Sequence, residues 1–335
     1  MQLKNAAMRL SKLFRAPAIK DQRIGIAPIY KVSFEGEPEL IGTGFWVTTR
    51  GHFVTAKHVI DDNIGADGVD RGMIYAICMT PDRQFHPRAL GRTFRHELFD
   101  LALSETLGPD GPEDPDDGDT VVTWPVALTL KELEPGDSVH THAFVSGNQP
   151  FFAGKEPGRT TSEFGATLEI PALNIVYDLN FRTRRESGRV GEVFPEGRDK
   201  VMLPFPCFQS EMPLYGANSG GPVFDDKGRV CGVNCSGYEG TDISFHLPIK
   251  SVIELRVPNI EFIPEDPTAR SRSLAELGLA RRVVFQPSAA SSFFPIWQRI
   301  FMWPIHVYLD VLAHWRWARR REGTRATASD DLPPS

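Results

Sequence analysis

Apolar and β-branched residues recur along this chain in short runs rather than at helical spacing. Residues 24–34 and 41–48 are two such runs, and further runs cover 52–60, 73–79, 85–90, 166–170, 173–181, 229–234 and 243–248. Runs of this length, bounded by Gly, Pro, Asp and Asn, are typical of β-strands. The pattern predicts that the strand over residues 52–60 has His58 near its end. Between residues 146 and 206 it indicates only short strands joined by long loops.

Two terminal segments depart from this pattern and predict helices. Residues 1–15 place apolar side chains at helical spacing with basic residues between them, and residues 293–317 hold four of the six tryptophans, followed by three arginines. The first helix is expected to dock on the rest of the protein, or to act as a membrane-surface anchor or targeting peptide. The second is too polar to span a bilayer, and we expect it to bend near Pro304 and to lie on a membrane surface, on this chain or on a partner.

The runs divide the chain into three parts. A basic amphipathic extension covers residues 1–23, a β-rich domain covers 24–257, and a second extension covers 258–335, of which the last residues from 323 are expected to be disordered. Short strands at fairly regular spacing with few helical periods favour a β-barrel or sandwich over an α/β sheet. The predicted fold class is therefore all-β, with short helices in the two extensions.

Composition and charge are those of a soluble protein whose body is acidic. Of the 335 residues 41% are hydrophobic and 24% charged, and the formal net charge is −6. Residues 1–20 and residues 270–335 each carry +5, so the remainder carries −16. An acidic body argues against a nucleic-acid-binding core. The first twenty residues lack the continuous apolar stretch of a secretory signal, which predicts a cytoplasmic, reducing setting, with membrane association possible only through the ends.

Four cysteines are too few and too scattered for a disulfide scaffold: Cys78, Cys207, Cys231 and Cys235. Four residues of extended strand span about 13 Å, beyond the roughly 7 Å limit between the Cα atoms of a disulfide. Cys231 and Cys235 are therefore predicted to be small core residues. Zinc is disfavoured without a second Cys or His pair, and no metal site is predicted.

The segment with the strongest chemical character runs from residue 215 to residue 224. Ser219 lies among glycines directly before an apolar run, which is how a nucleophile is displayed on a turn. A serine hydroxyl needs a base and an orienting acid. His58 can supply the base, and Asp100, which opens an apolar run and is expected to be partly buried, can accept a hydrogen bond from it.

The order His58, Asp100, Ser219 is one of the known orders of the acyl-transfer triad. The chain here resembles the trypsin-like (chymotrypsin-fold) serine proteases, closest in style to the bacterial HtrA-like branch. The resemblance is carried by Thr-Ala-Lys-His at residues 55–58, Asp-Leu-Ala-Leu at 100–103 and Asn-Ser-Gly-Gly-Pro at 218–222. The turn at 136–139 and the Thr-Gly-Phe run at 43–45 are weaker matches. The resemblance as a whole covers about residues 24–257 and excludes both ends of the chain.

The resemblance implies a chymotrypsin-like double β-barrel and a serine endopeptidase that cuts polypeptides through an acyl-enzyme. Ser219 would attack the carbonyl, His58 would move the proton and Asp100 would orient the imidazole. Backbone N–H groups of Ser219 and Ala217 would form the oxyanion hole. No cofactor is implied.

Two departures from the family pattern stand beside the nucleophile. Ala217 replaces the usual glycine, so a Cβ disfavours the backbone geometry that aims its N–H at the oxyanion. Asn218 replaces the aspartate of zymogen-type members, so activation by N-terminal cleavage is not expected. By the family's spacing Pro213 occupies the position that selects basic side chains in trypsin, which predicts an apolar or small P1 residue. Cys235, Ser236 and Gly237 are predicted to pair with the substrate backbone.

Two other functions remain open. Because of Ala217, the domain could be a catalytically weak or inactive protease-fold module that binds or senses a partner. Alternatively, the two basic ends could be the working parts and tether the acidic domain to a membrane or a partner protein.

Overall fold

The computed structural model describes residues 21–33, 38–48, 51–64, 72–107, 123–129, 131–145, 160–170, 175–257 and 272–273. The helices predicted within residues 1–15 and 293–317 lie outside these ranges, and the predicted boundaries of the two extensions stay predictions. Within the described ranges, no helix is both long and apolar enough to pass through a bilayer.

The first half of the described chain forms a closed antiparallel barrel. Its strands follow one another around the ring in the order β1, β2, β3, β6, β5, β4. Their bounds are β1 Ile26–Ser33, β2 Glu39–Trp46, β3 His52–Thr55, β4 Gly72–Met79, β5 Phe85–Arg95 and β6 Ala102–Leu107. Trp46 and Phe53 fill part of its interior, with ring centroids 4.7 Å apart and both side chains fully buried.

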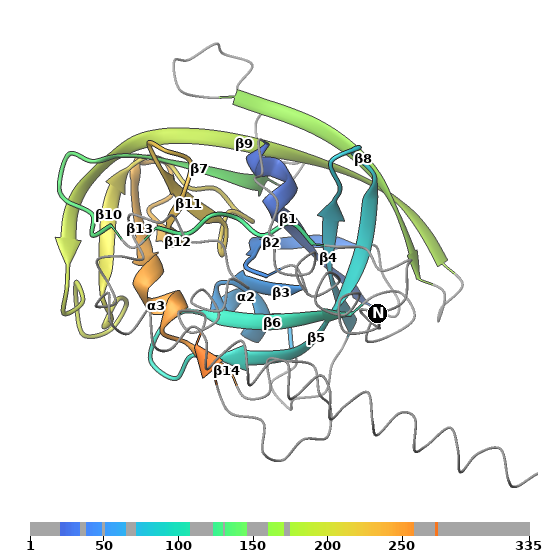
Figure 1. Ribbon diagram of the computed structural model, residues 1–335, viewed down its shortest axis with the longest axis horizontal. Coiled ribbons are helices and arrows are strands. Elements are labelled where there is room, and N and C mark those ends of the chain that lie inside the picture. Colours follow the sequence, from blue (N-terminus) through green and yellow to red (C-terminus); the bar gives the residue numbers. More distant parts are fainter. Residues whose placement is uncertain are drawn as a thin grey trace, which may run out of the picture.

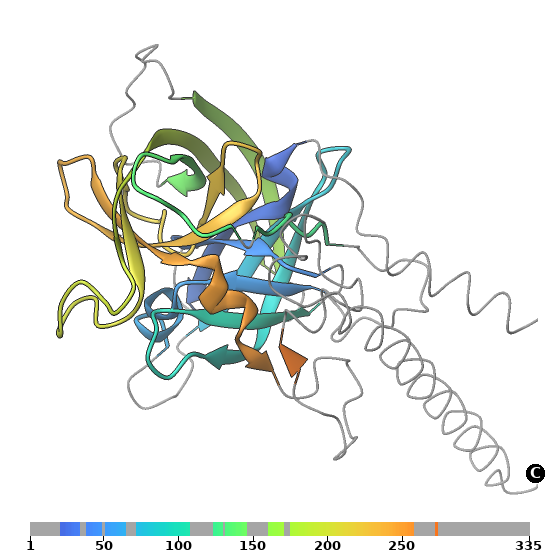
Figure 2. The same cartoon turned by 60° about the vertical axis from the view of Figure 1, so that its left-hand side comes forward.

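The second half forms a sheet in the order β10, β13, β12, β11, β7, β9, β8. An additional pairing between β10 and β9 closes six of these strands into a second barrel, and β8 pairs with β9 outside the ring. The bounds are β7 Ser138–Val145, β8 Thr160–Ile170, β9 Ile175–Phe194, β10 Cys207–Glu211, β11 Pro222–Asp225, β12 Val230–Gly237 and β13 Ile243–Pro248. The predicted all-β double barrel is confirmed (Figures 1 and 2).

Helices in the described ranges are short. They are a 3₁₀ turn η1 at Gln22–Gly25, α2 at Lys57–Asp61 and α3 at Ile249–Ile253, and a two-residue strand pair joins β14 (Arg256–Val257) to β15 (Arg272–Ser273). The strand predicted over residues 52–60 is therefore wrong beyond Thr55, because residues 57–61 form a helical turn closed by Asp62 N–H donating to the His58 carbonyl. A continuous apolar run does not distinguish a strand from a buried helical turn.

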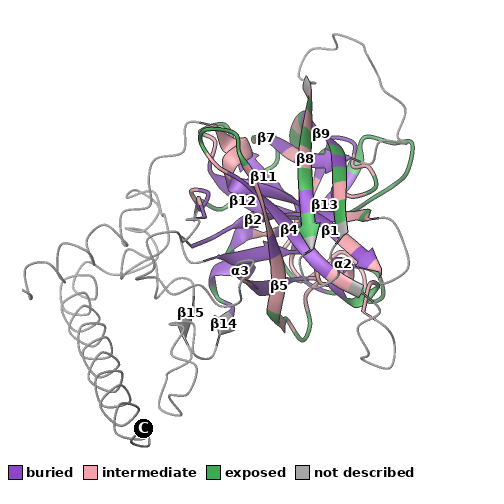
Figure 3. Ribbon diagram, turned by 90° about the vertical axis from the view of Figure 1, so that its right-hand side faces the viewer, coloured by how far each residue is buried: buried purple, intermediate pink, exposed green. Residues whose placement is uncertain are grey.

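The prediction of short strands and long loops between residues 146 and 206 is also wrong, because β9 alone is twenty residues long. Its first part pairs with β8, its middle with β7 and its end with β10. Figure 1 shows the β8–β9 hairpin arching over one side of the molecule. Along β8, exposed and partly buried residues alternate, as expected of a strand with one covered face (Figure 3).

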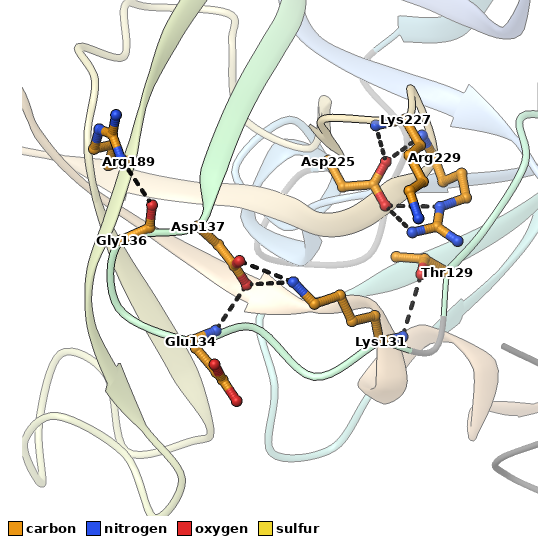
Figure 4. Close-up of polar contacts among 9 residues, drawn as sticks. All are labelled: Thr129, Lys131, Glu134, Gly136, Asp137, Arg189, Asp225, Lys227 and Arg229. Carbon is orange, nitrogen blue, oxygen red and sulfur yellow. Dashed lines mark hydrogen bonds and ion pairs between the residues drawn. The ribbon is translucent and has the colours of Figure 1, made fainter.

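Ion pairs fix two turns of the second barrel (Figure 4). Before β7, Lys131 Nζ lies 2.8 Å from both carboxylate oxygens of Asp137, which also accepts the Glu134 N–H. In the β11–β12 hairpin, Asp225 accepts Arg229 Nε at 2.7 Å with both side chains buried. This hairpin leaves from the strand that follows Ser219, so the pair anchors the distal end of that strand.

Three histidines of the second barrel, of which His140 and His246 are buried and His142 is partly buried, make the stability of the fold sensitive to acid. Burial lowers the pKa of His140 and His142 to about 4 and that of His246 to about 3. Each ring is neutral when folded but takes up a proton near pH 6.5 when unfolded, so stability is full above that pH and is lost as the pH falls. We expect the free energy of unfolding to drop by on the order of 5 kcal/mol between pH 7 and pH 5.

Urea titrations at the two pH values measure this drop. In His140→Phe one of the three groups is removed, so the drop should shrink by roughly a third. An equal drop in the parent and in His140→Phe would contradict the assignment of the acid sensitivity to these rings.

Candidate active site

His58 and Asp100 lie next to two paired strands of the first barrel. His58 lies in α2, directly after β3, and Asp100 lies just before β6, which pairs with β3. The His58 backbone N–H donates to Asp100 Oδ1 at 2.9 Å, and His58 Nδ1 lies 2.8 Å from Asp100 Oδ2. Because a carboxylate only accepts, Nδ1 carries the proton and Nε2 is left for a substrate or nucleophile.

The two groups shift each other's pKa in the directions that favour the charged pair. Burial alone lowers the pKa of His58, but the hydrogen bond and charge of Asp100 outweigh it and raise the pKa above its usual value. Burial raises the pKa of Asp100, and the His58 hydrogen bonds and charge, with the Cys235 thiol, bring it below its usual value. At neutral pH the Asp100 carboxylate is therefore ionised and favours the protonated form of His58.

Ser219 lies on the loop between β10 and β11, and contacts from the first barrel hold it. Its carbonyl accepts the Thr43 N–H at 3.0 Å. Gly220, at φ +79°, approaches the first barrel so closely that a Cβ would lie 2.5 Å from Thr43 O and from Ala56 N. Only glycine fits there, which explains the glycine after Ser219.

Ser219, His58 and Asp100 line one cavity of about 930 Å³. In the part of the chain that the structure describes, no hydrogen bond joins Ser219 to His58. Catalytic hydrogen bonds are often long in the absence of substrate. The three predicted residues therefore line one cavity, and of the two expected hydrogen bonds the one between His58 and Asp100 is formed.

The predicted substrate-binding residues line the same cavity. They are Pro213, in the loop after β10, and Cys235, Ser236 and Gly237, at the end of β12. Other lining residues are Met202, Leu203, Phe205, Leu214, Tyr215, Gly216, Glu239, Gly240, Thr241 and Asp242. Neither lysine nor arginine is among the residues that line this cavity. The roles in substrate binding stay predictions.

The predicted oxyanion donor Ala217 stands in a strained turn. Asn218 N–H donates to the Tyr215 carbonyl at 3.0 Å, and Ala217 has φ +69° while Gly216 does not have a positive φ. This is a type II turn with alanine at the position that normally requires glycine. Types I and II differ by about 150° in ψ of the second residue and about 170° in φ of the third, so they point the central N–H, here that of Ala217, in opposite directions.

Asn218 is buried, and its side-chain amide both donates and accepts a hydrogen bond. Its Nδ2 donates to the Phe144 carbonyl at 2.7 Å, and its Oδ1 accepts the Tyr215 N–H at 2.9 Å. The side chain thus ties the turn to β7. The expectation that N-terminal cleavage does not activate this domain stays a prediction.

The sequence profile of the trypsin-like peptidase domain matches residues 42–233, more than half of the chain. The chain belongs to the trypsin-like peptidase family. No curated protein sequence matches it significantly.

Solved structures with a similar arrangement include proteases of low sequence identity to this trypsin-like peptidase. One is Deg5, with 19% identity and a TM-score of 0.45, covering 78% of this chain and 98% of that one. Another is the HtrA-type protease AlgW with a decapeptide, with 17% identity and a TM-score of 0.42, covering 69% and 62%. The MamO protease domain from Magnetospirillum magneticum has 13% identity and a TM-score of 0.40, covering 69% and 94%.

Cys235 makes a contact in this trypsin-like peptidase that could not be predicted from the sequence. Cys235 and Cys231 are both buried, as predicted for small core residues. Cys235 Sγ also donates to Asp100 Oδ2 at 3.1 Å, so a thiol completes the hydrogen bonds of the carboxylate. Burial raises the pKa of this thiol, which keeps its proton available for donation. Among the described residues, no cluster of three His, Cys, Asp or Glu could hold a metal ion.

The strain at Ala217 predicts that Ala217→Gly stabilises the protein. A positive φ costs a residue with a Cβ roughly 1–2 kcal/mol, and the extra freedom of glycine in the unfolded chain offsets about 0.4–1 kcal/mol of that gain. We expect the free energy of unfolding to rise by about 0.5–1 kcal/mol, measured by urea titration.

Arg83 offers a matched control, because it has φ +64° in an exposed turn far along the chain from the nucleophile. Arg83→Gly should stabilise by a similar amount and leave turnover unchanged. A loss of stability in Ala217→Gly would show that the turn holds no strain for glycine to relieve.

Proposed function

We propose that this protein is a serine endopeptidase that hydrolyses peptide bonds through an acyl-enzyme. The observation that carries the proposal is the double hydrogen bond of Asp100 to the backbone and ring of His58 in a cavity that Ser219 also lines. That bond fixes the imidazole tautomer that a general base needs. Membership of the trypsin-like peptidase family, in which the order His, Asp, Ser is known, also supports the proposed endopeptidase.

The mechanism follows from what each group can do. His58 Nε2 takes the proton of Ser219 Oγ as Oγ bonds to the substrate carbonyl carbon, and the imidazolium is stabilised by Asp100. The Ser219 N–H and the Ala217 N–H stabilise the oxyanion, a contribution of about 3–4 kcal/mol for a donor in comparable sites. The imidazolium then protonates the leaving amine, and a water molecule, deprotonated by His58, releases the acyl group.

The substrate preference proposed for this site is a small or apolar P1 residue. Pro213 and Leu214 offer no charge to a basic side chain. Apart from Asp100, which is paired with His58, the acids of the lining are Glu239 and Asp242, and both belong to the exposed turn between β12 and β13. An apolar side chain buried there gains about 25 cal/mol per Å² of surface removed from water.

Digestion of a denatured protein mixture, followed by mass spectrometry of the new termini, tests both the endopeptidase activity and the P1 preference. We expect cuts mainly after Ala, Val, Leu or Met, and none in a parallel digest with Ser219→Ala. A profile dominated by cuts after Arg or Lys would contradict the proposed P1 preference, and no cuts in either digest would contradict the endopeptidase.

The second candidate function is a protease-fold module without turnover, and the φ of +69° at Ala217 favours it. A turn strained at rest is prone to a flip that removes one oxyanion donor. Ala217→Gly separates the two functions. Turnover that appears only in Ala217→Gly would assign the natural chain to the inactive module, whereas similar turnover in both proteins would assign it to the enzymes.

A further inference from the structure

Behind the Ser219 loop lies a chain of polar side chains in the core of the second barrel. Ser210 on β10, His246 on β13 and Asn234 on β12 are each 0% exposed. Ser210 Oγ lies 2.7 Å from His246 Nε2, and His246 Nδ1 lies 3.1 Å from Asn234 Oδ1. Asn234 Nδ2 then reaches the carbonyl oxygen of Asn218, the residue before the nucleophile, at 3.2 Å.

The direction of every hydrogen bond in this chain follows from groups that can only accept. The Asn218 carbonyl accepts, so the Asn234 amide turns its Nδ2 toward it and its Oδ1 toward His246. Asn234 Oδ1 accepts in turn, so His246 Nδ1 carries the proton and Nε2 is bare. Ser210 donates to that bare nitrogen, because the neighbouring Ser244 hydroxyl donates to the Met212 carbonyl at 2.8 Å.

The last acceptor of the chain belongs to the peptide group that also holds a predicted oxyanion donor. The Asn218 carbonyl and the Ser219 N–H are parts of one planar unit and point in opposite directions. Fixing the carbonyl therefore fixes the direction of the Ser219 N–H. The backbone of Asn234 supports the same loop, since its carbonyl accepts the Gly220 N–H and its N–H donates to the Gly221 carbonyl, both at 2.8 Å.

We propose that His246 and Asn234 are positioning residues that hold the Asn218–Ser219 peptide so that the Ser219 N–H points at the oxyanion. The inference rests on the proposed function, because an oxyanion forms only if Ser219 attacks a carbonyl. All donations run from Ser210 toward Ser219, so each bond polarises the next and makes the terminal N–H a better donor. Burying this many polar groups is costly unless they are satisfied, and an apolar set of side chains would fill the same space more cheaply.

His246→Phe tests the proposal, because it keeps a ring of similar size and removes the donor to Asn234. Removing one oxyanion donor costs about 10²–10³ in kcat, and loosening one should cost less, about tenfold. We expect kcat to fall about tenfold per active site with KM unchanged. His246→Asn places an amide N–H where Nδ1–H was and should keep kcat within about threefold of the parent, even though it leaves a small cavity.

His140→Phe is the matched control. His140 is a buried histidine on β7 that contacts Gln22 and Phe224 rather than the nucleophile loop, so its loss should lower stability and leave kcat unchanged. A purely structural role for His246 predicts that activity follows stability across the three variants. Unchanged kcat in His246→Phe, or an equal loss of kcat in His246→Phe and His140→Phe, would overturn the proposal.

The backbone amide resonance of Ser219 in a ¹H–¹⁵N spectrum gives a readout that needs no turnover. It should move in His246→Phe and stay in place in His246→Asn and His140→Phe, and ring ¹⁵N shifts should report Nδ1–H for His246. A stationary Ser219 resonance or an Nε2–H tautomer would overturn the positioning role. If the variants show the expected shifts but the parent protein cleaves no substrate, the proposed function would be overturned, whereas the positioning of the Ser219 amide would still hold.

Discussion

Replacing Ser219 with alanine is expected to lower kcat by a factor of about 10⁴–10⁶ while leaving the fold intact. In the proposed mechanism the substitution removes the atom that forms the acyl-enzyme, and what remains is the rate supplied by the oxyanion hole and by substrate binding. The loop itself should persist, because its contacts use backbone groups: the Ser219 carbonyl accepts the Thr43 N–H and the Gly220 N–H donates to the Asn234 carbonyl. The measurement is hydrolysis of a fluorogenic peptide with an apolar P1 residue.

Ser251→Ala is the matched control for this substitution. Ser251 is also buried but lies on α3, and it lines a separate cavity of about 480 Å³. Its replacement should leave kcat unchanged. Residual activity within about tenfold of the parent in Ser219→Ala would mean that another group is the nucleophile, because nothing else in the mechanism can replace Oγ.

Replacing Asp100 with asparagine is expected to lower kcat by a factor of about 10⁴ at neutral pH. An amide can offer its N–H₂ to His58 and stabilise the tautomer with a bare Nδ1, which places the proton on the nitrogen that must receive one from Ser219. The thiol of Cys235 would also lose the carboxylate oxygen that accepts its hydrogen bond.

The pH profile separates this cause from a general loss of structure. Catalysis needs neutral His58, so kcat/KM falls as the pH drops through the pKa of that ring, which Asp100 raises. Without the carboxylate the pKa falls, and the acid limb of the profile should move to lower pH. An unmoved limb would show that Asp100 does not act on His58. Asp137→Asn, which breaks a pair with Lys131 near the surface, should change neither kcat nor the limb.

The parts of this site that could be predicted from sequence are those with a local signature. Each of the three predicted catalytic residues has such a signature in its neighbouring residues. Ser219 lies among glycines, Asp100 opens an apolar run, and His58 lies next to apolar residues. The structure adds the reason for one of them, since Gly220 passes too close to Thr43 and Ala56 for any side chain. The conformation around His58 could not be predicted, because the run Phe53–Ile60 is mostly apolar, and such a run fits a strand and a buried helical turn equally well.

What sequence could not reveal depends on pairing between distant segments. The length of β9 arises from three successive partners, β8, β7 and β10, and its glycines and arginines suggest loops when considered alone. The His246–Asn234 contact likewise joins two strands that are adjacent only in the folded barrel. Cys235 has the pattern of a core residue and is one, and its bond to Asp100 needs the two barrels to come together.

The most direct test of the central claim is covalent labelling of the native, full-length protein with a fluorophosphonate, followed by peptide mapping of the modified residue. A serine activated by the His58–Asp100 pair should react at Ser219, and labelling should be lost in Ser219→Ala and His58→Ala. Labelling spread over several surface residues, or equal labelling of the parent and His58→Ala, would contradict a catalytic triad at this site.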